Sequence, residues 1–175
     1  SKIHVIHWAT ELPKLVKKEN KFKEKLVVFA GRLTEQKGPD KFIEIAKMVH
    51  EQDENTRFVM AGMGELLEHL VDSGIHHGLK GKLHFTGHIS SDEMTELFAM
   101  ADVFCMPSVS EPFGLLAIEA AAHEVPMVLS KQSGAAEILP AALTADFWNA
   151  EEFTSQILEL LYGESLGKRS ALKNK

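Results

Sequence analysis

The stretch "LVVFAGRLTEQKGPDKFIEIAKMVHEQ" (26–52) sets the architecture that the sequence predicts. Its first part, LVVFAG (26–31), is a short apolar run that ends in glycine, which is typical of a buried strand. From residue 40 onward the apolar residues recur at helical spacing, at Phe42, Ile45, Ala46 and Val49. Pro39 suits the first position of that helix, and Gly38 suits the turn before it. The stretch therefore predicts a strand, a loop and a helix in that order.

The same alternation of strand and helix patterns continues along the chain. Further strand-like runs lie at 57–62, 82–87, 102–108, 126–130 and 141–145. Helical patterns lie at 65–74, 90–101, from about Phe113, and at 150–163. Because such alternation builds a parallel sheet with helices on both faces, we expect an α/β, Rossmann-like doubly wound fold over residues 26–163. Residues 1–25 are interpreted as a linker or N-terminal extension, and residues 164–175 as a polar tail.

Composition restricts the classes of function. The 175 residues are 45% hydrophobic and 25% charged, which is typical of one globular domain. A net charge of -6 argues against a broad nucleic-acid surface, and no apolar stretch approaches membrane-spanning length. The single cysteine, Cys105, is expected to be a buried structural thiol in a reducing, cytoplasmic setting. The histidines lack partners at a metal-ligand spacing, so no metal site is predicted, and Trp148 is expected to be a packing residue.

The loop after the first predicted strand carries two cations. In parallel sheets ligands bind at the carboxyl ends of the strands, and Arg32 and Lys37 lie at that edge. Two cations beside a helix N-terminus form an anion site, and phosphate is the commonest small dianion. The alternative is a pair of solvated surface cations. Gly31, Gly62 and Gly87 each follow a strand and allow the backbone to approach a ligand closely.

A second feature is the stretch SVSEPFGLLAIEA (108–120). Glu111 precedes the predicted helix, whereas Glu119 lies inside an apolar run, where a buried charge needs a partner. The start of this helix offers unpaired backbone donors, the amides of Phe113, Gly114 and Leu115. Glu119 either accepts hydrogen bonds from two adjacent hydroxyls, as on a ribose, or pairs with a core cation or turns to the surface. Glu111 is either a ligand contact or a loop charge near the helix start.

Five blocks of the chain together resemble a known family. They are GRLTEQKG (31–38), FVMAGMGE (58–65), LHFTGHIS (83–90), MPSVSEPFGLLAIEAAAHEVPMV (106–128) and SGAAEIL (133–139). Their order and spacing resemble the C-terminal, nucleotide-sugar-binding half of retaining GT-B glycosyltransferases. This is the glycosyl transferases group 1 family, which includes bacterial glycogen and starch synthases. The resemblance covers roughly residues 26–160.

The resemblance implies a role for each matching residue. Arg32 and Lys37 would hold the donor's diphosphate and stabilise the leaving nucleoside diphosphate, and Glu111 would lie near the donor sugar's hydroxyls. These three are the implied catalytic residues. The implied donor-binding residues are Gly62, His88, Ile89, Phe113, Gly114, Leu115 and Glu119. Among them, His88 and Ile89 would meet the nucleobase and Glu119 the ribose hydroxyls.

The resemblance implies hexosyl transfer from a UDP- or ADP-sugar, without a separate cofactor or metal, and an α-glucan as a candidate acceptor. The family's N-terminal half binds the acceptor glycan, and nothing in residues 1–25 resembles it. The chain is therefore expected to be the donor-binding half, and not to be catalytically competent alone. Two alternatives stay open: a GT-B-like nucleotide-sugar epimerase domain, and a non-enzymatic doubly wound interaction module.

Two positions depart from the family's pattern. Ser133 stands where the family usually has a glycine, which is expected to alter the loop that faces the donor. Glu124 and Val125 stand where the family usually has a glycine before the proline-led strand, and this departure is expected to change only how a helix ends.

Overall fold

A computed structural model describes residues 23–163 and shows one six-stranded parallel sheet. The strands follow the order β3-β2-β1-β4-β5-β6. Their bounds are β1 Lys25–Ala30, β2 Thr56–Ala61, β3 Leu83–Gly87, β4 Val103–Met106, β5 Met127–Ser130 and β6 Leu143–Ala145. The helices are η1 Glu35–Lys37 (a 3-10 turn), α1 Pro39–Gln52, α2 Leu67–His76, α3 Ser91–Met100, α4 Leu115–Ala122, α5 Ala135–Ile138 and α6 Ala150–Tyr162. This arrangement confirms the expected doubly wound α/β fold.

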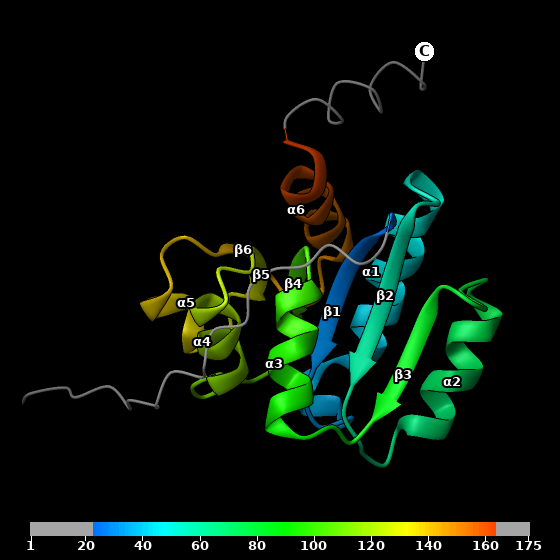
Figure 1. Ribbon diagram of the computed structural model, residues 1–175, viewed down its shortest axis with the longest axis horizontal. Coiled ribbons are helices and arrows are strands. Elements are labelled where there is room, and N and C mark those ends of the chain that lie inside the picture. Colours follow the sequence, from blue (N-terminus) through cyan, green and yellow to red (C-terminus); the bar gives the residue numbers. More distant parts are fainter. Residues whose placement is uncertain (1–22, 164–175) are drawn as a thin grey trace, which may run out of the picture.

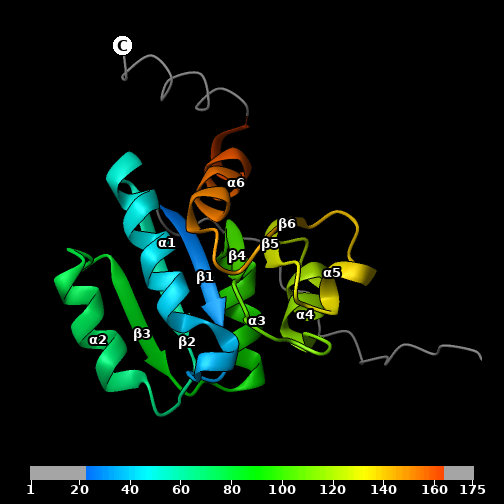
Figure 2. The ribbon, with the colours of Figure 1, turned by 180° about the vertical axis from the view of Figure 1, so that it is seen from behind.

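Helices cover both faces of the sheet. Figure 1 shows α3, α4 and α5 on one face, and Figure 2 shows α1, α2 and α6 on the other. Successive strand residues divide between the two cores, as the alternation of side chains in a strand requires. In β1, for example, Val27 and Phe29 pack under α1 and α6, whereas Val28 packs under α3 and α4. Cys105 is fully buried in the first of these cores, and burial raises the pKa of its thiol.

Most predicted elements form close to their expected bounds, and the differences have local causes. The α2 helix continues through Gly74 instead of ending there. The glycine at this position has a packing reason, because a Cβ atom would lie 3.1 Å from the Leu83 side chain of β3. The α4 helix begins at Leu115 rather than near Phe113, because Gly114 adopts a left-handed conformation (φ 85°) as its N-cap. The expectation that Trp148 packs inside the protein is wrong, because 61% of its surface is exposed.

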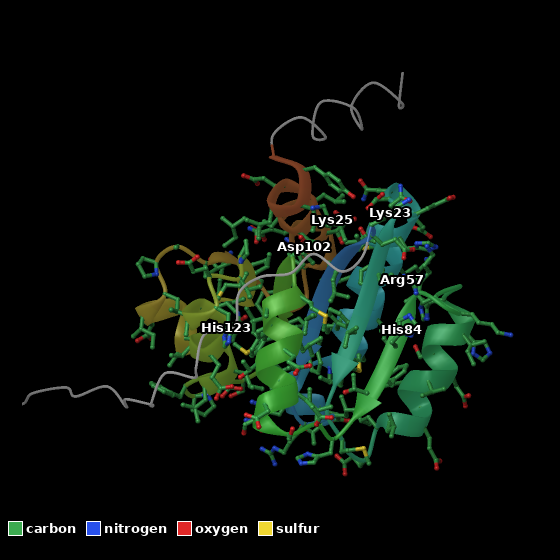
Figure 3. All side chains as sticks on the ribbon, viewed as in Figure 1. Lys23, Lys25, Arg57, His84, Asp102 and His123 are labelled. Carbon is green, nitrogen blue, oxygen red and sulfur yellow. The ribbon has the colours of Figure 1, made fainter. Side chains whose placement is uncertain are left out.

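The amino edge of the sheet is closed by charged side chains. Asp102 accepts a hydrogen bond from the Leu26 amide at 3.0 Å, and its carboxylate lies 3.5 Å from Lys25 Nζ. Figure 3 shows Lys25 and Asp102 together at this end, with Arg57 and His84 on the neighbouring strands. These contacts join β1 to β4 at the edge opposite to the carboxyl ends of the strands.

No helix within residues 23–163 is long and apolar enough to cross a membrane.

The end of α4 explains one of the two departures from the family's pattern. The Glu124 amide donates to the Ala121 carbonyl at 2.9 Å, and the Val125 amide donates to the Ala120 carbonyl at 3.1 Å. This is the Schellman arrangement, in which the residue after the cap is normally a left-handed glycine. Glu124 takes that conformation, with φ at 57°, and it is the only non-glycine residue with positive φ among those described.

Replacing Glu124 by glycine should therefore stabilise the protein. Relief of the left-handed strain outweighs the larger entropy of an unfolded chain with glycine, so Glu124→Gly is expected to raise the free energy of unfolding by about 0.5–1 kcal/mol. Denaturant unfolding measures this change. Glu124→Ala is the matched control, since alanine keeps the strain, and an equal gain in that variant would contradict the explanation.

Candidate functional site

The candidate site lies at the topological switch point of the sheet. The chain leaves β1 toward β2 on one side, and β4 pairs with β1 on the other side. The loops that follow β1 (31–38) and β4 (107–114) therefore diverge, and crevices of this kind bind ligands in doubly wound sheets. The carboxyl ends of β1, β2 and β3 meet at the lower edge in Figure 1.

One ion pair bridges the two loops. Lys37 donates from Nζ to Oε2 of Glu111, which links the loop after β1 to the loop after β4. The Glu111 side chain is only 9% exposed and that of Lys37 is 20% exposed. The second carboxylate oxygen, Oε1, accepts from the Gly114 amide at 3.1 Å and, at a longer 3.5 Å, from the Phe113 amide. Glu111 is therefore a buried, fully coordinated carboxylate rather than a solvated loop charge.

The sequence predicts unpaired backbone donors at the start of α4. The structure places Phe113 and Gly114 at the predicted position, but Glu111 accepts hydrogen bonds from both amides. Leu115 begins the helix, and its side chain is 45% exposed. The carboxylate of Glu111 thus occupies the anion-binding position that the sequence assigned to a ligand.

Close backbone contacts explain three glycines around this pair. A Cβ atom on Gly38 would lie 2.3 Å from the Pro107 carbonyl oxygen, and one on Gly134 would lie 2.2 Å from that of Pro112. One on Gly62 would lie 1.8 Å from the Gly31 carbonyl oxygen. These approaches fix the loops after β1, β2, β4 and β5 relative to one another, and no larger residue fits without moving the backbone.

Sequence reasoning missed Gln132, in the loop after β5. The Glu111 amide donates to the Gln132 carbonyl at 3.3 Å, and the Gly134 amide donates to the Glu111 carbonyl at 2.8 Å. The Gln132 side chain also donates to Asp146 Oδ1 at 3.1 Å and accepts from the Phe147 amide at 3.3 Å. Gln132 therefore joins the Glu111 loop to the loop after β6. The only signal in the sequence was its position directly after a strand.

Ser133, the other departure from the family's pattern, is buried beside Gln132. Its hydroxyl accepts a hydrogen bond from the Ala135 amide at 3.2 Å, at the start of α5. Ser133 also forms an isolated parallel bridge with Glu111. The side chain thus stabilises the local turn and leaves the backbone contact with Glu111 in place.

Two predicted residues stay available to a ligand. Arg32 is exposed, and its guanidinium forms no hydrogen bond or ion pair within residues 23–163. Glu119 is half-buried on α4, and its carboxylate likewise has no hydrogen-bond or ion-pair partner in the described part of the chain. Burial raises the pKa of the Glu119 carboxyl, and the nearby His123 opposes this shift. Neither a core cation nor full exposure therefore accounts for Glu119.

The loop after β3 lies next to the loop after β2. The Gly62 amide donates to the Gly87 carbonyl at 2.9 Å, which joins the two loops. His88 is exposed, whereas Ile89 packs against the core between the sheet and α3. The structure thus brings Gly62, His88 and Ile89 to the same sheet edge as Arg32. Among the described residues, no group of three or more histidine, cysteine or acidic side chains is placed to hold a metal ion.

Solved structures share this fold. The C-terminal domain of a glycosyl transferase group 1 family protein from Francisella tularensis superposes with a TM-score of 0.71. It is 22% identical, and the match covers 79% of this chain and 75% of that one. Anabaena HepE in complex with UDP and glucose gives a TM-score of 0.73 at 21% identity, over 83% of this chain and 40% of that one. The fold is that of the C-terminal domain of a GT-B glycosyltransferase.

The family follows from the sequence match. The family model of the glycosyl transferases group 1 matches residues 13–175, and the chain belongs to this family. An uncharacterized glycosyltransferase of Methanocaldococcus jannaschii is 39% identical over 116 residues, which are 66% of this chain and 30% of that protein. Glycogen synthase of Mycobacterium tuberculosis is 33% identical over 111 residues, 63% of this chain and 27% of that protein. The chain thus matches about a third of the length of these relatives.

The pair of Lys37 and Glu111 should be strongly coupled in stability. We expect a double-mutant cycle of Lys37→Met and Glu111→Gln to give a coupling energy of about 1–3 kcal/mol, because both groups are largely removed from water. Urea unfolding of the four proteins measures it. The exposed pair of Lys47 and Glu51, 3.5 Å apart on α1, is the matched control and should give about 0.3–0.5 kcal/mol. Equal couplings for the two pairs would contradict the assigned role.

The raised pKa of Glu119 predicts a pH-dependent stability. A carboxyl whose pKa is higher in the folded state binds more protons when folded, so the folded protein loses stability as pH rises above the ordinary glutamate range. Glu119→Gln should therefore be more stable than the parent at neutral pH, and the difference should disappear at acidic pH. Unfolding curves across this range test the sign. Glu159→Gln, at an exposed site on α6, is the control; a Glu119 difference that grows toward acidic pH would refute the argument.

Proposed function

We propose that this chain is the donor-binding part of a retaining glycosyltransferase that uses a nucleoside diphosphate hexose. The observation that carries the proposal is the set of charges in the loop after β1. Arg32 has no ion-pair partner within residues 23–163, and the described partner of Lys37 is Glu111. Cations at the carboxyl edge of a doubly wound sheet suit a diphosphate. The family membership supports the same ligand.

The diphosphate would contact the two loops that the ion pair joins. In the proposed complex Arg32 and Lys37 both bind phosphate oxygens, and Lys37 exchanges its contact with Glu111 for one with the ligand. The same cations then stabilise the negative charge that develops on the leaving nucleoside diphosphate, which is electrostatic catalysis by groups already in position. In this proposal their two positive charges make a bound metal unnecessary.

The ribose would bind at Glu119. Two adjacent hydroxyls donate to one carboxylate, and such a ligand supplies the hydrogen bonds that Glu119 lacks among the described residues. The nucleobase would then lie toward the loop of His88 and Ile89. Glu111 keeps the hydrogen bond from the Gly114 amide and gains donor-sugar hydroxyls when Lys37 turns away.

The relatives support the finer parts of the proposal, the donor and the acceptor. Because the Anabaena structure contains UDP and glucose, a UDP-sugar is the first donor to test, with an ADP-sugar second. The similarity to glycogen synthase of Mycobacterium tuberculosis supports an α-glucan as acceptor. The acceptor glycan would bind to a part of the protein that precedes this domain, and the domain alone would not catalyse transfer.

Calorimetry with UDP, ADP and GDP tests the proposal. We expect weak binding of at least one nucleotide. Arg32→Ala should lower that affinity about 10- to 150-fold, since a charge-assisted contact to phosphate contributes about 1.5–3 kcal/mol. Higher salt should weaken binding to the parent protein more than binding to Arg32→Ala. Lys47→Ala, an exposed lysine change on α1, is the matched control and should leave the affinity unchanged.

The two glutamates separate the ribose from the sugar subsite. Glu119→Gln should weaken UDP binding more than Glu111→Gln does, because UDP carries the ribose and lacks the donor sugar. If the folded parent protein releases no heat with any of the three nucleotides, the donor-binding function is rejected. Equal affinities in both glutamate variants and the parent would reject only the ribose assignment.

A further inference from the structure

An exposed aromatic pair lies directly after β6. The rings of Phe147 and Trp148 meet edge to face, with centroids 4.8 Å apart and planes at 82°. Phe147 is half-buried, whereas Trp148 is 61% exposed, the highest value among the exposed large apolar side chains described. An aromatic side chain removes about 150–250 Å² from solvent when it is fully covered, so a ligand that packs on the exposed part of the indole buries apolar surface.

The segment that carries this pair is held firmly in place. The Phe147 amide donates to Gln132 Oε1 at 3.3 Å, and the Asn149 amide donates to the Asp146 carbonyl at 2.8 Å. Asn149 also caps α6, since its Oδ1 accepts from the Glu152 amide at 3.1 Å. Figure 2 shows the short orange connection between β6 and α6. The ring is therefore presented by a segment that is ordered before any ligand arrives.

Asp146 and Asn149, the residues on either side of the pair in the chain, have their polar groups matched within the protein. Asp146 accepts from Gln132 and Lys131, both at 3.1 Å, and these contacts hold the pKa of the Asp146 carboxyl below its usual range. Asn149 donates to the Glu152 carboxylate at 3.1 Å. The segment thus joins one exposed apolar ring to polar neighbours in the chain, Asp146 and Asn149, that are already paired. This favours a neutral ligand with one apolar face and a polar rim over an anion or a cation.

The pair lies on the same side of the molecule as the proposed site. Gln132 connects them directly, because its side chain binds the Phe147 amide and its carbonyl accepts from the Glu111 amide. Strands β4 and β6 are two positions apart in the sheet, so their carboxyl ends are separated by about 10 Å. A saccharide of a few residues spans such a distance. The nucleobase side, after β3, lies at the opposite end of the sheet.

We propose that Phe147 and Trp148 form a carbohydrate subsite that binds a neutral sugar ring of the acceptor glycan. One face of a pyranose consists of C–H groups, which pack on the indole, while its hydroxyls remain in water. The inference rests on the glycosyl-transfer function proposed above and adds to it a contact made by this domain. The subsite would hold a sugar unit that does not react, and Gln132 would keep the ring in a fixed position relative to Glu111.

A protein partner fits the pair less well. The other exposed large apolar side chains belong to other segments, namely Met63, Val71, Ile75, Val109 and Leu115. One indole with part of a phenyl ring is far smaller than the about 800 Å² that each partner buries in a stable interface. A single sugar ring matches this area.

The test uses heteronuclear NMR of the complete chain, with maltohexaose and a linear α-mannotriose as probes. The indole signal of Trp148, identified by its loss in Trp148→Phe, is expected to shift as either oligosaccharide is added at millimolar concentration. Trp148→Ala should lower the affinity about tenfold, which corresponds to about 1.4 kcal/mol. Ile75→Ala, which removes a similarly exposed apolar side chain on α2, is the matched control and should have no effect.

Titration of the same samples with UDP distinguishes this inference from the donor-binding function. UDP should leave the Trp148 signal in place, and Trp148→Ala should bind UDP as the parent does. If UDP binds but neither oligosaccharide moves the indole signal, the subsite is refuted and the donor site stands. If an oligosaccharide binds with equal affinity to Trp148→Ala, or if Trp148→Ala alters only the oligomeric state, the subsite is also refuted. Oligosaccharide shifts without UDP binding would support the subsite and count against the donor site.

Discussion

The pair of Lys37 and Glu111 is the interaction on which the candidate site depends. A doubly wound sheet of this order separates the loops after β1 and β4. A crevice between these loops keeps its shape only if contacts fix one loop relative to the other. Here an ion pair spans the crevice, and the close approach of Gly38 to the Pro107 carbonyl sets the distance between the loops. Because Glu111 is almost fully buried, its charge must be matched, and Lys37 together with the Gly114 amide does this. The position of each loop thus depends on the other.

Much of the fold could be predicted because local signals agree with one another. The apolar run of β1 is followed by a loop, by Pro39 at the start of α1 and by a helical apolar face, and all of these signals point to the same unit. The capping box of Ser90 and Glu93 marks the start of α3 just as reliably, because the two side chains satisfy each other's backbone amides. The strand order and the two cores then follow from alternation along the chain.

The details of the site depend on contacts between residues distant in sequence, which local patterns do not reveal. The stretch 108–120 indicates a carboxylate near free amides, but it does not show that Glu111 itself binds those amides. Nor does the sequence show that Gln132 joins two loops, since this depends on the neighbouring positions of β5 and β6. Trp148 illustrates the same limit. An apolar residue type predicts a buried side chain, but the exposure of Trp148 depends on where the segment between β6 and α6 lies in the fold.

Lys37 and Glu111 already satisfy each other's charge, and this has a consequence for binding. A diphosphate that recruits Lys37 must compete with Glu111, so part of the attraction between cation and phosphate offsets the loss of an existing contact. Arg32 has no such contact among the described residues, so its attraction to a phosphate is not offset by the loss of an existing ion pair. The first electrostatic contact of an incoming anion is therefore expected at Arg32, with exchange at Lys37 following. Once Lys37 has turned away, the buried Glu111 carboxylate has lost one hydrogen-bond donor. The hydroxyls of a sugar can replace that donor, whereas a bare diphosphate offers only acceptors. In the proposed function the same exchange makes the site favour the intact donor over the nucleotide that remains after transfer.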